Sequence, residues 1–149
     1  MNDKNEYKED SLITDEAIEI DADLGYVKFL GSISSKKYIY AKAGSGIKAG
    51  EGIEAGEGIK AGWGLKAGEG IKAGEGIKAG EGIKAGEGIK AGEGIISGLL
   101  GTRLGDIISR WIDVKLRICA GFNCKEEKII DAKIKHGTII LGKLKGVKL

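Results

Sequence analysis

One pattern of hydrophobic and polar positions dominates the chain between residues 43 and 95. An aliphatic residue recurs every six positions from Ile47 to Ile95, and the full unit reads Ile-Lys-Ala-Gly-Glu-Gly. Residues two apart share one face of a β-strand, so the aliphatic residue and the alanine point inward and the lysine points outward. The hexad therefore predicts a short, half-buried strand followed by a glycine-containing corner.

A helix does not fit this pattern. Apolar residues six positions apart fall on different sides of a helix and would not form one apolar face. In addition, each glycine in a helix costs about 1 kcal/mol relative to alanine. Strands in soluble domains run about 3–10 residues, so the chain must bend at every Gly-Glu-Gly. Identical strands joined by identical corners predict a β-solenoid.

Three hexads would close one triangular coil. The aliphatic residues would then stack in three ladders, Ile47–Leu65–Ile83, Ile53–Ile71–Ile89 and Ile59–Ile77–Ile95. A two-sided coil made of two hexads is the alternative geometry. A disordered glycine-rich linker is disfavoured, because the aliphatic residue keeps its phase throughout.

The outward positions of the repeat carry lysine in mid-strand and glutamate at the corners. Alternating rows of opposite charge indicate either a solvated, self-neutralising surface or a regular charged face for a partner. Trp63 and Leu65 stand where glutamate and isoleucine are expected. We expect Trp63 either to contact a partner or to pack as part of the fold.

The N-terminal part divides into two segments. Residues 1–14 are charged and aperiodic, and we expect a flexible acidic arm. Residues 15–42 are expected to form a β cap, a hairpin whose first strand buries Ile18 and Ile20 and exposes Glu19, Asp21 and Asp23. This acidic strand face is either a solvated edge or a mimic of DNA.

Residues 96–111 are expected to form an amphipathic helical cap. Apolar residues recur there at three-and-four spacing, which predicts a short helix over about residues 102–111, with Arg103 and Arg110 on its polar side. A helix lying on a membrane surface is the competing interpretation.

Residues 112–149 are expected to form a C-terminal β region. In its first strand Ile112, Val114 and Ile118 point inward, whereas Lys115, Arg117 and Cys119 point outward. From Ile129 the aliphatic residues fall five apart, which predicts further coiled β structure or two ordinary strands with glycine turns.

Charge is unevenly distributed along the chain. Residues 1–24 carry nine acids and two lysines (net −7), and residues 103–149 carry eleven bases and five acids (net +6). Such polarity can steer partners or order head-to-tail stacking. The sequence pI of 8.4 lies below the value of about 9 typical of nucleic-acid binders.

The acidic N-terminus, the lack of a run of about 20 apolar residues and the two cysteines favour a cytoplasmic protein. Cys119 and Cys124 lack the further ligands that zinc requires, because His136 is the only histidine. Cys119 lies near Arg117 and Lys125, which could lower its pKa. We expect no metal, no cofactor and no enzymatic activity.

The hexad of residues 43–95 resembles the repeats of hexapeptide-repeat β-helices and of bactofilins. The small residue follows the aliphatic residue here, whereas it precedes it in the left-handed families, so handedness stays open. The five-residue spacing at 129–149 is similar to that of pentapeptide-repeat proteins. Acyltransferases and carbonic anhydrases among the β-helices depend on histidines, and the repeat contains none.

These features together predict a mainly β protein: a single-stranded β-solenoid with an N-terminal β cap and a C-terminal helix plus β segment. We expect a non-enzymatic structural or interaction protein that binds a protein partner or itself. The alternatives are an inhibitor from a phage or mobile element, similar to anti-CRISPR proteins, and a filament-forming scaffold. The candidate contact residues are Trp63, Glu19, Asp21, Asp23, Arg103, Arg110, Lys115 and Arg117.

Overall fold

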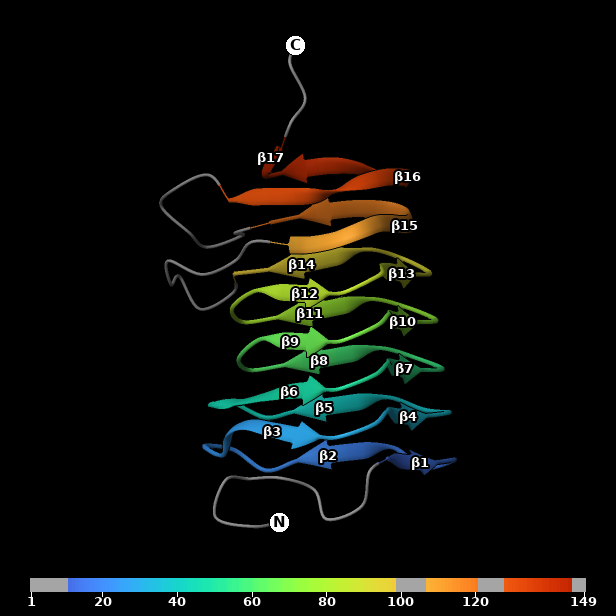
Figure 1. Ribbon diagram of the computed structural model, residues 1–149, viewed down its shortest axis with the longest axis vertical. Coiled ribbons are helices and arrows are strands. Elements are labelled where there is room, and N and C mark those ends of the chain that lie inside the picture. Colours follow the sequence, from blue (N-terminus) through green and yellow to red (C-terminus); the bar gives the residue numbers. More distant parts are fainter. Residues whose placement is uncertain (1–10, 99–106, 121–127, 146–149) are drawn as a thin grey trace.

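The strands of the chain stack as a parallel β-solenoid, with the N-terminus at one end of the stack and the C-terminus at the other (Figure 1). The computed structural model describes residues 11–98, 107–120 and 128–145, and only the backbone at residues 109–111, 115 and 116. Every pairing among the described strands is parallel and joins one coil to the next.

Each coil has three faces, which we number in chain order. Face 1 contains β1 (Leu12–Thr14), β4 (Ile33–Ser35), β7 (Ile53–Ala55), β10 (Ile71–Ala73) and β13 (Gly88–Ala91). Face 2 contains β2 (Ile18–Ile20), β5 (Ile39–Ala41), β8 (Ile59–Ala61), β11 (Ile77–Ala79) and β14 (Ile95–Ser97). Face 3 contains β3 (Gly25–Phe29), β6 (Ser45–Ala49), β9 (Leu65–Ala67) and β12 (Ile83–Ala85).

Longer strands form the C-terminal coils. β15 (Ile107–Cys119) pairs in turn with β12, β13 and β14, so it runs along all three faces. β16 (Ile129–Leu141) lies on β15, and β17 (Lys143–Leu144) lies on the start of β16. Gly137 and Gly142 have positive φ angles of 115° and 109°, and they bend the chain from one face to the next.

One aliphatic ladder runs through the stack behind each face. The ladder of face 1 is Leu12, Ile33, Ile53, Ile71, Ile89, Ile112 and Ile134. That of face 2 is Ile18, Ile39, Ile59, Ile77, Ile95, Ile118 and Ile139. That of face 3 is Val27, Ile47, Leu65, Ile83, Ile107, Ile130 and Leu144. The three-sided coil predicted for the hexads, with one hexad on each side, is confirmed.

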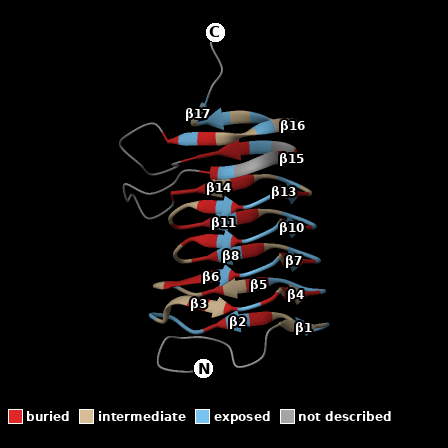
Figure 2. Ribbon diagram, viewed as in Figure 1, coloured by how far each residue is buried: buried red, intermediate tan, exposed pale blue. Residues whose placement is uncertain are grey.

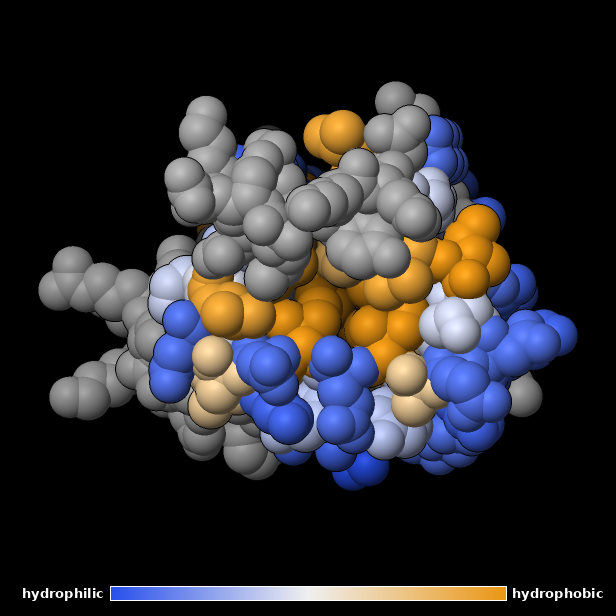
Figure 3. All heavy atoms as spheres, turned by 90° about the horizontal axis from the view of Figure 1, so that it is seen from below, coloured by the Kyte–Doolittle hydropathy of each residue, from blue (hydrophilic) through white to orange (hydrophobic). Residues whose placement is uncertain are grey.

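The alternation of buried and exposed residues follows the strand period (Figure 2). In β10, Ile71 is 1% exposed and Ala73 is 3% exposed, while Lys72 between them is exposed. Burying one isoleucine side chain contributes roughly 1.5–3 kcal/mol. Viewed from the N-terminal end, apolar side chains gather at the centre and hydrophilic side chains lie along the rim below it (Figure 3).

The two glycines of each Gly-Glu-Gly corner have different roles. A Cβ on the first glycine, for example Gly74, would overlap the carbonyl oxygen of Gly56 in the preceding coil. A Cβ on the second glycine has room at some corners, for example at Gly58, where the nearest atom would be the Gly76 carbonyl oxygen at 3.4 Å, but at Gly46, Gly64 and Gly94 it would come within 3 Å of a neighbouring atom. Stacking therefore requires the first glycine, and it leaves the second sterically free only at corners such as Gly58.

The N-terminal hairpin that we expected is wrong. β2 pairs with β5 and β3 pairs with β6, both in parallel, so residues 15–42 continue the solenoid. Asp23 (φ 61°) and Gly25 (φ 66°) form a left-handed corner where the prediction placed a hairpin turn. The flexible arm expected over residues 1–14 is wrong for Leu12–Thr14, which form β1; residues 1–10 lie outside the described part.

The helix expected over about residues 102–111 is wrong from Ile107 onward, where the chain is strand β15; residues 99–106 lie outside the described part. Ile107 and Ile112 cover the ladder residues Ile83 and Ile89, and this stacking overrides the helical spacing. In the last coils Ile130 continues the ladder of face 3, whereas Ile129, which the five-residue spacing predicted, is 42% exposed.

Within residues 11–98, 107–120 and 128–145 we find no helix with the length and apolar character that a membrane crossing needs.

The ladder makes the fold sensitive to one residue and insensitive to its neighbour. Ile71→Lys places an unpaired charge between Ile53 and Ile89, and we expect it to abolish the cooperative unfolding transition followed by circular dichroism. Lys72→Glu alters an exposed side chain and should change the free energy of unfolding by less than about 1 kcal/mol. Equal tolerance of both changes would contradict the inward assignment of Ile71.

Candidate functional site

The parallel register lines up the outward side chains in columns. On face 3 the column starts with an uninterrupted row of lysines, namely Lys28, Lys48, Lys66 and Lys84, and continues with Ile108 and Asp131. On face 1 the column mixes signs and reads Ser34, Glu54, Lys72, Lys90 and Asp113. On face 2 it reads Glu19, Tyr40, Lys60, Lys78 and Ile96. The three faces therefore differ in charge.

The lysine column of face 3 lacks compensation from within its own row. Neighbouring strands lie about 4.8 Å apart, where two exposed like charges repel by about 1 kcal/mol before salt screening. On face 1, by contrast, Lys72 Nζ lies 3.8 Å from Glu54 Oε1. Face 3 is thus the most positive of the three described strand faces.

An aromatic site interrupts face 3 beside this column. Tyr26 lies lengthwise over the glycines of the following coils, because a Cβ at Gly46 would come within 2.7 Å of its ring and one at Gly64 would overlap its hydroxyl. The Trp63 ring meets Tyr26 edge-on, with 5.7 Å between centroids. Lys66 Nζ lies 4.7 Å from the centre of the Tyr26 ring, a cation–π contact.

The Tyr26 hydroxyl is held at the far end of this site. It accepts a hydrogen bond from the backbone N–H of Gly64 and donates one to the carboxylate of Glu81. Burial raises the pKa of the Tyr26 phenol, the Glu81 charge raises it further, and the Gly64 hydrogen bond acts in the opposite direction. We call Gly46, Gly64, Trp63, Lys66 and Glu81 the Tyr26 site.

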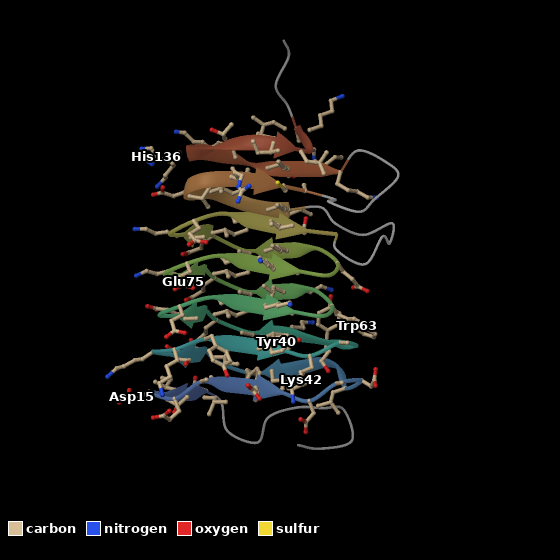
Figure 4. All side chains as sticks on the ribbon, turned by 180° about the vertical axis from the view of Figure 1, so that it is seen from behind. Asp15, Tyr40, Lys42, Trp63, Glu75 and His136 are labelled. Atoms are coloured by element: carbon tan, nitrogen blue, oxygen red, sulfur yellow. The ribbon has the colours of Figure 1, made fainter. Side chains whose placement is uncertain are left out.

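Face 2 carries an open groove of about 380 Å³. Its lining includes Gly58 and Gly76, Lys60 and Lys78 on one side, and Glu75 and Glu93 on the other. Figure 4 shows this side of the molecule, with Tyr40 near its middle, Glu75 toward one edge and Trp63 toward the other. We call this the face 2 groove.

Two of the three acidic candidates of the first coil, Glu19 and Asp21, are paired with one lysine of the next coil. Lys42 Nζ lies 3.9 Å from Glu19 Oε2 and 3.8 Å from Asp21 Oδ1, and the Tyr38 hydroxyl donates to Glu19 Oε1 at 2.8 Å. Asp23 occupies the left-handed corner and is exposed. Glu19 and Asp21 therefore share one partner.

The basic candidates are only partly described. Arg103 lies outside the described residues, and Arg110 and Lys115 lie on β15, where only their backbone is described. Arg117 is exposed, and its backbone follows Gly94 in the column that contains Gly58 and Gly76. The candidates thus do not form one site, but Arg117 lies at the C-terminal end of the face 2 column.

Cys119 and His136 differ from expectation. Cys119 is buried rather than exposed, although its backbone pairs with that of Ile96 in the outward column of face 2. Burial raises the pKa of the Cys119 thiol, and the smaller effect of Arg117 only partly opposes it, so the lowered pKa is wrong. Cys124 lies outside the described part. His136 is in β16, with Nδ1 3.0 Å from Asp113 Oδ1.

Among the described residues, no three side chains of His, Cys, Asp or Glu converge as a metal site would require. The groove on face 2 is open, and its lining consists mainly of glycines, exposed charged residues and the two tyrosines Tyr38 and Tyr40. The chemistry that these surfaces offer is hydrogen bonding, ion pairing and contact with aromatic rings.

Two features of these surfaces were missed from sequence. Lys28 was not placed in the lysine column, because the step from Lys28 to Lys48 is longer than the three hexads that lead from Lys48 to Lys66. Tyr26 was read as part of a hairpin, although its position before Val27 matches the second glycine of each hexad. The departure at Trp63 was the available signal, because that ring packs against Tyr26.

Comparisons of the chain with protein-family models, with curated proteins and with solved structures found no match. The resemblance to hexapeptide-repeat and bactofilin-like proteins correctly predicted a parallel β-solenoid, and membership of either family stays a prediction.

The two glycine environments predict opposite effects of one substitution. Gly64→Ala would overlap the Tyr26 hydroxyl and come within 2.9 Å of the Gly82 carbonyl oxygen, so we expect it to destabilise the protein by about 1–3 kcal/mol. Gly76→Ala meets nothing closer than 3.6 Å and should be neutral or stabilising by up to about 1 kcal/mol. Urea denaturation measures both, and equal losses would contradict the Tyr26 site.

Proposed function

We propose that the protein is a non-enzymatic interaction protein, a rigid solenoid that binds the acidic surface of a protein partner through the lysine column of face 3. The observation that carries this proposal is the uninterrupted row of Lys28, Lys48, Lys66 and Lys84 on strands in fixed register. The hexad and the parallel coils also support a relationship to hexapeptide-repeat or bactofilin-like β-helices.

The charge pattern favours an acidic partner. Like charges on adjacent strands oppose folding, and a partner carboxylate near each lysine would replace repulsion with attraction. The ladders behind the column hold the strands in register, so little ordering of backbone is needed on binding. Electrostatic complementarity of this kind mainly accelerates association and selects the partner.

An inhibitory role that depends on an acidic, DNA-like surface gains no support from the first coil. The carboxylates of Asp15, Glu16 and Asp21 already face Lys36, Lys37 and Lys42 of the next coil. Their charge is therefore partly compensated within the chain.

The partner can be tested by reversing one column at a time. Affinity capture from cell lysate would compare the wild-type protein with Lys48→Glu/Lys84→Glu on face 3 and with Lys72→Glu/Lys90→Glu on face 1 as the matched control. We expect the face 3 variant to lose the proteins that wild type and control retain, and retention to fall as salt rises. Loss of the same proteins from both variants, or from neither, would argue against the proposal.

A filament-forming scaffold is a second candidate, favoured by the two ends of the stack. Within the described residues, β1, β2 and β3 each pair with a strand on one side only, and Ile134, Ile139 and Leu144 are the last members of the same ladders at the other end. The first coil is rich in acids, whereas the described C-terminal coil carries Lys133, Lys135, Lys143 and Lys145. Opposite charge and matching ladders support head-to-tail stacking.

Head-to-tail stacking predicts species that grow with concentration. Sedimentation velocity should show a ladder of sizes that shifts to larger species as the protein is concentrated and to smaller species in high salt. Lys133→Glu/Lys143→Glu reverses charge at one end and should lower the average size at equal concentration. A single species at every concentration tested would exclude this assembly.

A further inference from the structure

The second glycine of each hexad precedes the ladder residue, and it forms one column on each face. On face 3 the column begins with Tyr26 and continues through Gly46 and Gly64. On face 2 it begins with Tyr38 and continues through Gly58, Gly76 and Gly94. On face 1 it begins with Ser32 and continues through Gly52 and Gly70. The same backbone groove is therefore built three times.

The groove on face 3 is filled, and its occupant shows what the groove accepts. The Tyr26 ring covers Gly46 and Gly64, Lys66 of the second following coil lies over the ring, and Glu81 of the third following coil takes the hydroxyl. The contacts combine a flat glycine floor, a cation over the ring, an N–H donor and a carboxylate acceptor. Each one suits a phenol.

Face 2 repeats this arrangement without an occupant. Counted from Tyr38, Gly58 and Gly76 form the floor, Lys78 stands in the second following coil and Glu93 in the third, as Lys66 and Glu81 do from Tyr26. The Glu93 carboxylate reaches over the floor, because its Oε2 lies 3.9 Å from where a Gly76 Cβ would be. All of these residues line the face 2 groove.

The donors of the floor are available on face 2. The N–H groups of Gly58 and Gly76 donate to no acceptor within the described part of the chain, whereas the equivalent N–H of Gly64 donates to Tyr26. Tyr38 does not take the place of Tyr26, because its hydroxyl bonds to Glu19 in the preceding coil. On face 1, Ser32 Oγ already accepts from the N–H of Gly52 at 3.4 Å.

The fold does not require glycine at the floor positions. A Cβ would lie 3.4 Å from its nearest neighbour at Gly58 and 3.6 Å at Gly76, and neither residue has a φ in the left-handed region. Packing therefore does not explain why this groove is kept free of side chains, whereas the seating of an aromatic ring does.

We propose that the face 2 groove binds a tyrosine side chain presented by a partner protein, with its ring over Gly58 and Gly76, its hydroxyl between the Gly76 N–H and the Glu93 carboxylate, and Lys78 over the ring. This inference relies on the proposed interaction role only for the source of the tyrosine. The groove itself is tested without any partner.

The test uses N-acetyl-L-tyrosinamide as the probe and the amide resonances of the whole protein as the readout. Titration to about 20 mM, a range suited to a single side chain, should shift the amides of Gly58, Gly76 and Lys78 in a saturable manner. N-acetyl-L-phenylalaninamide lacks the hydroxyl and should bind about 10-fold more weakly.

A matched pair of variants locates the site. Gly76→Ala places a methyl group on the groove floor and should abolish the shifts, while Gly70→Ala at the equivalent place on face 1 should leave them unchanged. Thermal unfolding verifies that both variants remain folded. Absence of shifts in wild type, binding that survives Gly76→Ala, or equal affinity for the phenylalanine probe would each overturn the proposal. None of these outcomes bears on capture through the lysine column, which its own variants test.

Discussion

The stacking of aliphatic side chains between successive coils is the interaction on which the whole molecule depends. One coil has no core of its own, because each face contributes one large side chain that is covered only by its neighbours above and below. The three ladders keep their register although the spacing between paired residues changes from 21 to 18 to 24 along the chain. In the step from Ile18 to Ile39 the additional residues lie between Ile20 of β2 and Val27, the ladder residue of β3.

The surface inherits its order from these ladders. Parallel register converts a six-residue repeat into columns, so that a charge, a glycine or an aromatic ring in one coil meets its counterpart in the next. The corner glycines illustrate this order. The first glycine of each pair leaves room for a carbonyl oxygen of the neighbouring coil, and the second leaves a groove on the outer surface. Tyr26 then fills one groove with a residue that comes from before the repeat.

The sequence predicted the repeat region well and its surroundings less well. The phase of the hexad predicted a solenoid and left two or three hexads per turn as alternatives, and the pairing of Leu65 with Ile47 and Ile83 shows that three hexads close one turn. The hairpin at residues 15–42 and the helix ending at Trp111 failed for a common reason. Their local patterns fit two structures, and pairing with a coil distant in sequence decides between them. The same holds for the site: Trp63 was noticeable as a departure, while its partner Tyr26 lies far from it in the sequence and looked ordinary.

The triangular cross-section has a consequence for how such a protein can change in length. Three hexads add one complete coil, so a gain or loss of three would alter the length of the rod by about 4.8 Å and leave every face aligned with itself. A gain or loss of a single hexad would instead rotate everything that follows by one face. β15, which now begins on the same face as β12, would then begin on another face. The two ends of the rod would be rotated relative to each other. The number of repeats thus determines the rotation of one end of the rod relative to the other as well as the length of the rod.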